Sequence, residues 1–169
     1  MKLNKIVYAL LAAAAAASGL SESLEGEAVA GVVPTLADAV AQSPQIIRVE
    51  VTDVPADGRA VAVEVWEVLF GDFETAGWVD PRYDAPGTDG APPRTLAFDF
   101  KKGAQYLLFC QRGAGGVYKP FFYWNTRWGV ADVVGGVDGN VDLSRLAEGN
   151  RTIKLAELRE LVKEIKWGL

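Results

Sequence analysis

Histidine is absent from this chain of 169 residues, and cysteine occurs only once. The lack of histidine excludes catalytic triads that rely on an imidazole base, and it removes the usual nitrogen ligand of zinc. The single cysteine, Cys110, cannot form an intrachain disulfide or a thiolate metal cluster. We therefore expect packing, with no cross-links, to hold the fold, and we expect no cofactor.

Cys110 ends an apolar run over residues 106–110. Free cysteine is among the most frequently buried residue types, so the sequence predicts a small core residue in a strand. A reactive or intermolecular thiol is the alternative interpretation.

Long apolar runs are also scarce, and the longest one lies at the N-terminus. Lys2 and Lys5 precede an apolar stretch over residues 6–17, which small residues follow. This order is typical of a secretory signal peptide, and we expect one over residues 1–17, with a cut as late as residue 30. The stretch is shorter than the ~20 residues that a membrane-spanning helix needs. The sequence thus predicts a secreted or periplasmic protein without a membrane span.

Positive charge is in deficit. The formal net charge is −5, and it becomes −7 when Lys2 and Lys5 are removed with the signal peptide. An acidic chain is poorly suited to the phosphates of nucleic acid or to an anionic membrane surface. After the signal peptide we expect a flexible leader over residues 18–31 and one domain over residues 32–169. A domain of this length can be built around a single hydrophobic core.

What is present is a series of short β-branched and aromatic runs between turn signals. Together they predict a mainly β fold, a small closed barrel or a sandwich, with a helix near each end. In the second strand we expect Val61, Val63 and Val65 on one side, and Ala62, Trp66, Val68 and Phe70 on the other. The expected elements are a helix at 36–41 with Thr35 as its N-cap, strands at 46–54, 60–70, 94–100, 104–111, 117–124 and 128–134, and an amphipathic helix at 155–165.

Two connections matter for the topology. Residues 71–93 contain four prolines and four glycines without clear periodicity, so they are interpreted as a long surface loop. The strands at 117–124 and 128–134 flank Asn125 and Thr126, and they are expected to form a hairpin.

Three segments together carry a family resemblance. Residues 67–72 read Glu-Val-Leu-Phe-Gly-Asp at the end of a strand, residues 102–109 read Lys-Gly-Ala-Gln-Tyr-Leu-Leu-Phe, and residues 155–162 form an L-x-E-L-x-x-L-V helix. Over residues 32–165 the chain resembles bacterial exported proteins of the tissue-inhibitor-of-metalloprotease-like, netrin-module-like OB-fold group. The resemblance implies a small OB-like barrel of five or six strands.

The resemblance leaves the ligand open. Eukaryotic metalloprotease inhibitors of this group reach the protease zinc with an N-terminal cysteine, and disulfides hold that edge. Neither candidate mature start, Ser18 or Gly31, is a cysteine. No inhibitory residue is therefore carried over to this chain.

An aromatic cluster at residues 121–128 is the candidate binding site. Aromatic faces stack on sugars, on bases or on apolar anchors of a partner protein. If strand alternation leaves one face of this hairpin exposed, its aromatics and polar residues could hold a ligand. The alternative is ordinary barrel core. The candidate residues are Tyr123, Trp124, Asn125, Arg127 and Trp128.

Metal and catalytic patterns are weak by comparison. Oxygen-bearing residues alternate over residues 138–144, but Leu143 and Gly149 stand where an EF-hand requires glycine and glutamate, so no metal site is predicted. No spacing selects a pair of catalytic carboxylates. The function expected is that of a non-enzymatic binding module for an extracytoplasmic protein. A carbohydrate-binding module is the alternative, with polysaccharide as the partner, and a carboxylate-based hydrolase is the third possibility.

Overall fold

The computed structural model describes residues 33–72, 75–85, 91–121, 128–149 and 151–169. The predicted signal peptide and leader lie outside these residues. In the described part of the chain the helices are α2 (Leu36–Gln42) and α3 (Leu155–Trp167), and the short 3-10 turns are η1 (Ala114–Gly116) and η2 (Gly136–Asp138). The described strands, in chain order, are β1 (Gln45–Asp53), β2 (Val61–Phe70), β3 (Ala76–Val79), β4 (Arg82–Ala85), β5 (Arg94–Ala97), β6 (Gln105–Arg112), β7 (Val117–Pro120), β8 (Val130–Val134), β9 (Asn140–Asp142) and β10 (Thr152–Lys154).

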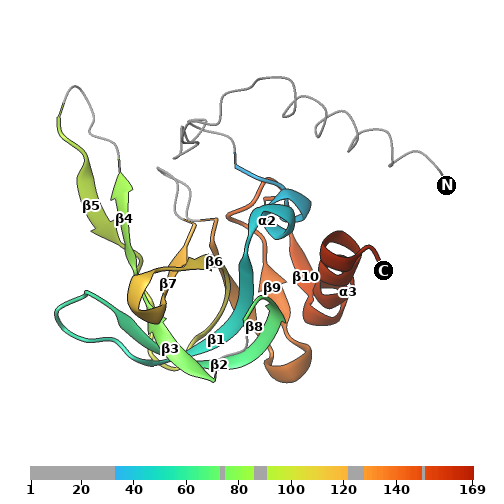
Figure 1. Cartoon of the computed structure of the whole chain (residues 1–169), viewed down its shortest axis with the longest axis horizontal. Coiled ribbons are helices and arrows are strands. Elements are labelled where there is room, and N and C mark those ends of the chain that lie inside the picture. Colours follow the sequence, from blue (N-terminus) through green and yellow to red (C-terminus); the bar gives the residue numbers. More distant parts are fainter. Residues whose placement is uncertain (1–32, 73–74, 86–90, 122–127, 150) are drawn as a thin grey trace.

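Five of the strands close into a barrel. They are paired in the order β1-β2-β3-β7-β6, and β6 pairs with β1 to complete the ring. All neighbours are antiparallel except β3 and β7, which run parallel. Strands β8, β9 and β10 extend the sheet outward from β6 (Figure 1). The predicted mainly β, OB-like barrel with two helices is confirmed.

Alternation along the strands fills the barrel interior. Val49 of β1, Val63 of β2 and Leu108 of β6 point inward, and each is at most 2 % exposed. Cys110 is among these interior residues and is fully buried, which confirms the prediction made for it. Burial raises the pKa of its thiol, so Cys110 is a packing residue.

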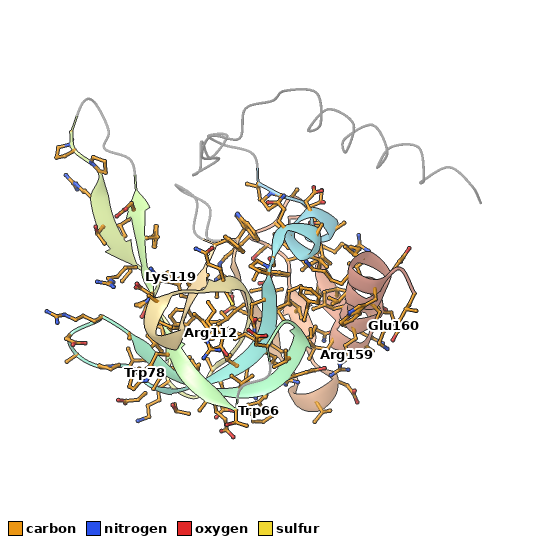
Figure 2. The ribbon with its side chains drawn as sticks, viewed as in Figure 1. Trp66, Trp78, Arg112, Lys119, Arg159 and Glu160 are labelled. Atoms are coloured by element: carbon orange, nitrogen blue, oxygen red, sulfur yellow. The ribbon has the colours of Figure 1, made fainter. Side chains whose placement is uncertain are left out.

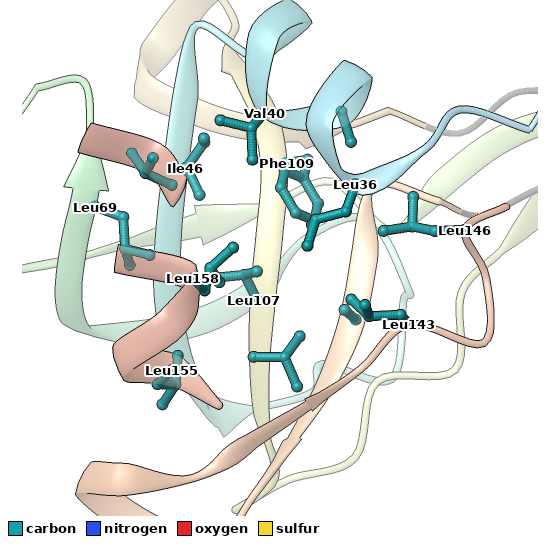
Figure 3. Close-up of a cluster of buried hydrophobic side chains, with 14 of the residues drawn as sticks. Leu36, Val40, Ile46, Leu69, Leu107, Phe109, Leu143, Leu146, Leu155 and Leu158 are labelled. Carbon is teal, nitrogen blue, oxygen red and sulfur yellow. The ribbon is translucent and has the colours of Figure 1, made fainter. Parts of the chain in front are cut away.

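A second core lies on the outer side of β1 and β6, beneath α2, α3 and strands β8–β10; we call this side the covered face. Ile46 and Leu107 point out of the barrel into this second core, where Leu158 of α3 packs in the same cluster (Figure 3). All three side chains are fully buried. Residues of β1 and β6 are thus buried on both sides of the sheet, as the continuous apolar run over residues 106–110 of β6 requires.

Local signals account for both helices. The Thr35 hydroxyl accepts a hydrogen bond from the Asp38 amide, and the Asp38 carboxylate accepts from Thr35, forming a capping box that starts α2. The helix α3 presents an apolar stripe to the covered face and ends at Gly168 in a left-handed conformation. Both helices were predicted, each one or two residues shorter.

The prediction that residues 71–93 form a loop is wrong. They contain β3, which joins β2 to β7 in the barrel, and β4, which pairs with β5 in a separate hairpin. Both strands have four residues, too few to show a period against the surrounding prolines and glycines. The strand expected at 94–100 is β5, and it belongs to this hairpin, which projects from the barrel (Figure 1).

Among the described residues, the hairpin expected from residues 117–124 and 128–134 is also not formed as a strand ladder. Strands β7 and β8 both pair with β6, at different positions along it. Between the described residues of the two segments, a backbone hydrogen bond runs from Gly129 N to Phe121 O at 2.8 Å. The long strand β6 is thus the pairing partner of both β7 and β8.

Candidate functional site

The aromatic cluster chosen from the sequence lies mostly outside the described residues; this applies to Tyr123, Trp124, Asn125 and Arg127. Trp128 is described, and it is 2 % exposed. Its ring stacks on Phe121, with ring centroids 5.1 Å apart and planes inclined by 15°. Trp128 is therefore placed in the core of the covered face, where it offers no surface to a ligand.

Two other tryptophans are exposed on a different part of the barrel. Trp66 of β2 is 47 % exposed and Trp78 of β3 is 50 % exposed. The outer side of β2, β3 and β7 bears both of them, and we call this surface the open face (Figure 2). Large apolar side chains at the surface are informative when they gather on one face.

The position of Trp78 follows from strand register. Ala62 lies between the inward-pointing Val61 and Val63, so it faces outward, and Trp78 is its register partner on β3. On its other side Trp78 is paired with Val117 of β7. The small Ala62 leaves the Trp78 ring standing above the sheet.

The position of Trp66 depends on a β-bulge. Val49 pairs with Val65 and Arg48 pairs with Glu67, so Trp66 is an extra residue opposite Arg48. A bulge of this kind directs two neighbouring side chains to the same side of a sheet. The bulge also turns Val68, the register partner of Ile47, toward the barrel interior, which corrects the expected alternation.

The guanidinium of Arg48 packs against the ring of Trp66. Its guanidinium carbon lies 5.3 Å from the centroid of the indole, in the range of a cation–π contact. Arg48 is only 2 % exposed, and it donates to the Gln105 side chain and to the carbonyls of Gly136 and Val137. Burial lowers the pKa of Arg48, and the nearby Glu67 partly offsets this. The contacts fix the guanidinium under the ring.

An ion pair marks the border between the two faces. Glu67 of β2 accepts two hydrogen bonds from Arg159 of α3, at 2.6 and 2.9 Å. These bonds raise the pKa of Arg159, and they join the helix to the barrel. On the far side of this pair no described helix crosses the strands, and the open face begins (Figure 2).

Two carboxylates lie close together beside Trp66. Glu50 of β1 and Glu64 of β2 are register partners, and Glu50 accepts a hydrogen bond from the Gln105 side chain. Glu64 is exposed and Glu50 is half-buried, so the pair lies at the surface of the sheet. Paired carboxylates that act as acid and base are usually held in less hydrated surroundings that separate their pKa values. The arrangement fits polar contacts to a ligand better than catalysis.

The exposed tryptophans were only partly visible in the sequence. Trp66 was expected on the side opposite Val61, Val63 and Val65, but nothing in the sequence indicated that this side is uncovered. Trp78 fell in the segment interpreted as a loop. A tryptophan flanked by the small residues Ala76 and Gly77 in a segment rich in turn formers was the available signal.

Among the described residues, no group of three or more acidic, cysteine or histidine side chains is arranged to hold a metal ion. The helices of the described residues are all too short or too polar to cross a membrane.

Comparison with known proteins found no matching family model, no similar curated protein and no similar solved structure.

Proposed function

We propose that this protein is an exported, non-enzymatic binding module whose ligand lies across the open face. The observation that carries the proposal is the pair Trp66 and Trp78, each about half exposed on the same side of the barrel. Exposed aromatic surface is unfavourable in water, and tryptophan is enriched among the residues that dominate binding energies. A ligand that covers these rings would account for their position.

A carbohydrate is the ligand class that the surroundings of the two rings favour over a protein. Trp66 lies four residues along β2 from the partner of Trp78, a separation of about 13 Å along the strand. Glu64 stands between them, so the exposed apolar surface is divided into two rings with polar neighbours. Protein interfaces instead centre on a contiguous apolar cluster. By fold-level analogy, OB-folds bind oligosaccharides on this side of the barrel.

Export rests on the N-terminal pattern of residues 1–17. We expect mass spectrometry of the protein recovered from its native host to find a chain that begins after residue 17, or at the latest near residue 31. An intact N-terminus on cytoplasmic protein would overturn this part of the proposal. Membership of the netrin-like group stays a prediction, because none of the comparisons matched.

The binding proposal can be tested with tryptophan variants of equal exposure. Trp167 of α3 is 54 % exposed and lies away from the open face, beside Phe70, so it is the matched control. The wild type and the variants Trp66→Ala, Trp78→Ala and Trp167→Ala are passed over a panel of immobilised polysaccharides. We expect the first two variants to lose about 2 kcal/mol of binding free energy, roughly thirtyfold in affinity, and Trp167→Ala to match the wild type.

Cooperative thermal unfolding of all three variants shows that each is folded. If Trp66→Ala and Trp78→Ala bind as well as the wild type to every polysaccharide that the wild type retains, the open face is not the binding surface.

A further inference from the structure

The open face holds its two tryptophans farther apart than one sugar ring can reach. Trp78 is paired with Ala62 across β3 and β2, and Trp66 lies four residues beyond Ala62 on the same side of β2. The two positions are therefore about 13 Å apart along the strand and about 5 Å apart across it. A single sugar ring covers one indole. One ligand can cover both tryptophans only if it is a chain of several rings.

The surface around the two rings is flat. Each tryptophan keeps about half of its surface in solvent, so the described residues do not enclose either ring in a pocket (Figure 2). The sheet between them carries small side chains, with Ala62 beside Trp78 and Ala76 as the register partner of Glu64. A site for the end of a chain has to close around that end. A flat sheet surface instead suits the interior of a chain that runs across it.

Both rings are held in place by the fold before a ligand arrives. Trp66 rests on the guanidinium of Arg48, which lies 5.3 Å from the centroid of the indole and is itself buried. Trp78 belongs to a strand that is paired on both sides, with Ala62 on β2 and Val117 on β7. Little conformational freedom is lost when such fixed side chains are covered. A chain already stacked on one ring can therefore gain affinity from the second.

Hydrogen-bond acceptors lie between the two rings. Glu64 stands on the outer side of β2 between Ala62 and Trp66, and it is exposed. Glu50, its register partner on β1, adds a second carboxylate. Ionised carboxylates only accept hydrogen bonds, so they match the hydroxyl groups of a sugar, and their charge repels an acidic one. The middle of the open face thus favours a neutral chain over an acidic chain.

We propose that the ligand of the open face is a neutral, linear polysaccharide in an extended conformation, bound along the interior of its chain. One sugar ring would stack on Trp78 and a later ring of the same chain on Trp66. This inference rests on the proposed function. An extended, cellulose-type chain presents the flat faces of its rings at a regular repeat, as two aromatic platforms on one sheet require. A chain that coils into a helix turns its successive rings away from a flat surface.

The first experiment measures affinity against chain length. Cello-oligosaccharides from the disaccharide upward are titrated into the protein by calorimetry. We expect a step in affinity of at least tenfold at the length that first reaches both tryptophans, and little change beyond it. Malto-oligosaccharides of the same lengths, which coil, should show no such step.

Tryptophan variants assign the step to the two rings. In Trp66→Ala and in Trp78→Ala the step should disappear, because a longer chain then finds no second platform. Trp66→Leu and Trp78→Leu keep an apolar side chain in place, and they should lose the step as well. Trp167→Ala removes an equally exposed ring from α3, so it is the matched control and should keep the step.

A second measurement separates binding along a chain from binding at its ends. Soluble glucomannan, a neutral linear polymer, is divided into fractions of short and long chains. Because interior sites scale with the mass of polymer, we expect the same amount of protein to bind per gram of each fraction at saturation. An amount that falls in proportion to chain length would assign binding to the chain ends and overturn the inference.

The inference and the proposed function fail in different ways. A disaccharide that binds as tightly as the long oligomers, or an equal step with malto-oligosaccharides, would rule out the extended chain. The binding proposal would survive both results if Trp66→Ala and Trp78→Ala weakened binding. A step that persists in either variant would place the chain elsewhere on the protein. If none of these chains binds, the inference is wrong, and the polysaccharide panel with the Trp66, Trp78 and Trp167 variants decides whether the open face binds carbohydrate at all.

Discussion

The covered face and the open face are two outer sides of one barrel, and they differ in what the chain places over them. Outward residues of β1 are apolar where α3 lies above them, as at Ile46, and polar beyond the helix, as at Glu50. Trp66 and Trp78 depart from this rule, because they are large and apolar where no described helix or strand covers them. A departure of this kind, seen against the rule that the neighbouring strand β1 obeys, indicates function better than exposure alone.

The largest expected effect on stability comes from replacing one tryptophan on each face by alanine and comparing the two losses. We expect Trp128→Ala to lower the free energy of unfolding by about 3–5 kcal/mol, because it leaves a cavity beside Phe121 and Phe109. Trp78→Ala removes a half-exposed ring, and it should cost no more than about 1.5 kcal/mol. Urea denaturation followed by circular dichroism measures both. Similar losses for the two variants would mean that Trp78 is a structural residue.

A second test concerns the inner side of β3 and β7, two of the strands that also carry the open face. A Cβ atom on Gly77 would lie 2.8 Å from Cε2 of Tyr118, a buried ring inside the barrel. Gly77→Ala should therefore force the ring aside and cost about 1–3 kcal/mol in thermal or chemical unfolding. Combining it with Tyr118→Leu, which makes room for the methyl group, should cost less than the sum of the two single losses. Full additivity would show that the two residues do not meet.

A third test concerns the strand that both faces share. Cys110 is fully buried in β6, so Cys110→Ala should cost about 1 kcal/mol through the small cavity that it leaves. The thiol of the native protein should react with Ellman's reagent only at the rate of global unfolding, because burial raises its pKa and blocks access. The unfolded chain in urea provides the full signal. Rapid reaction under native conditions would place Cys110 at the surface.

The smallest effect is expected at the base of the β4–β5 hairpin. The hydrogen bond from Arg82 lowers the pKa of Asp80, so the pair stabilises the folded state fully above the unfolded pKa of about 3.9. This contribution is lost as the pH falls through the lower pKa of the folded state. Because Arg82 is half exposed, Asp80→Asn should cost less than about 1 kcal/mol at pH 7.

The difference in stability between the wild type and Asp80→Asn should vanish in strong acid. The exposed Glu160→Gln on α3 serves as a control, with little effect at pH 7. A difference that persists at the lowest pH would assign the effect to something other than the ion pair.

Much of the fold could be predicted because its signals are local. The Thr35 cap and the apolar stripe of α3 each depend on a few neighbouring residues, and the structure bears out the helices they define. Strand β3 could not be found in this way. Its four residues become a strand only through pairing with β2 and β7, and one of these partners lies far along the chain.

The candidate site was harder to predict for the same reason. That Trp78 faces outward follows from its register with Ala62. That no described element covers it follows from where α3 packs. Both are properties of the closed barrel. The cluster at residues 121–128 looked more promising because its aromatics are adjacent in sequence, but the described part of that cluster, Trp128, fills the core.

The parallel pairing of β3 with β7 also has a kinetic consequence. Antiparallel neighbours such as β1 and β2 can form as soon as their turn is made, whereas β3 must wait for the β4–β5 hairpin and all of β6 before its second partner exists. Closure of the ring thus requires contacts of high sequence separation, and such contacts slow folding. A chain synthesised from its N-terminus keeps an incomplete barrel until β7 has emerged.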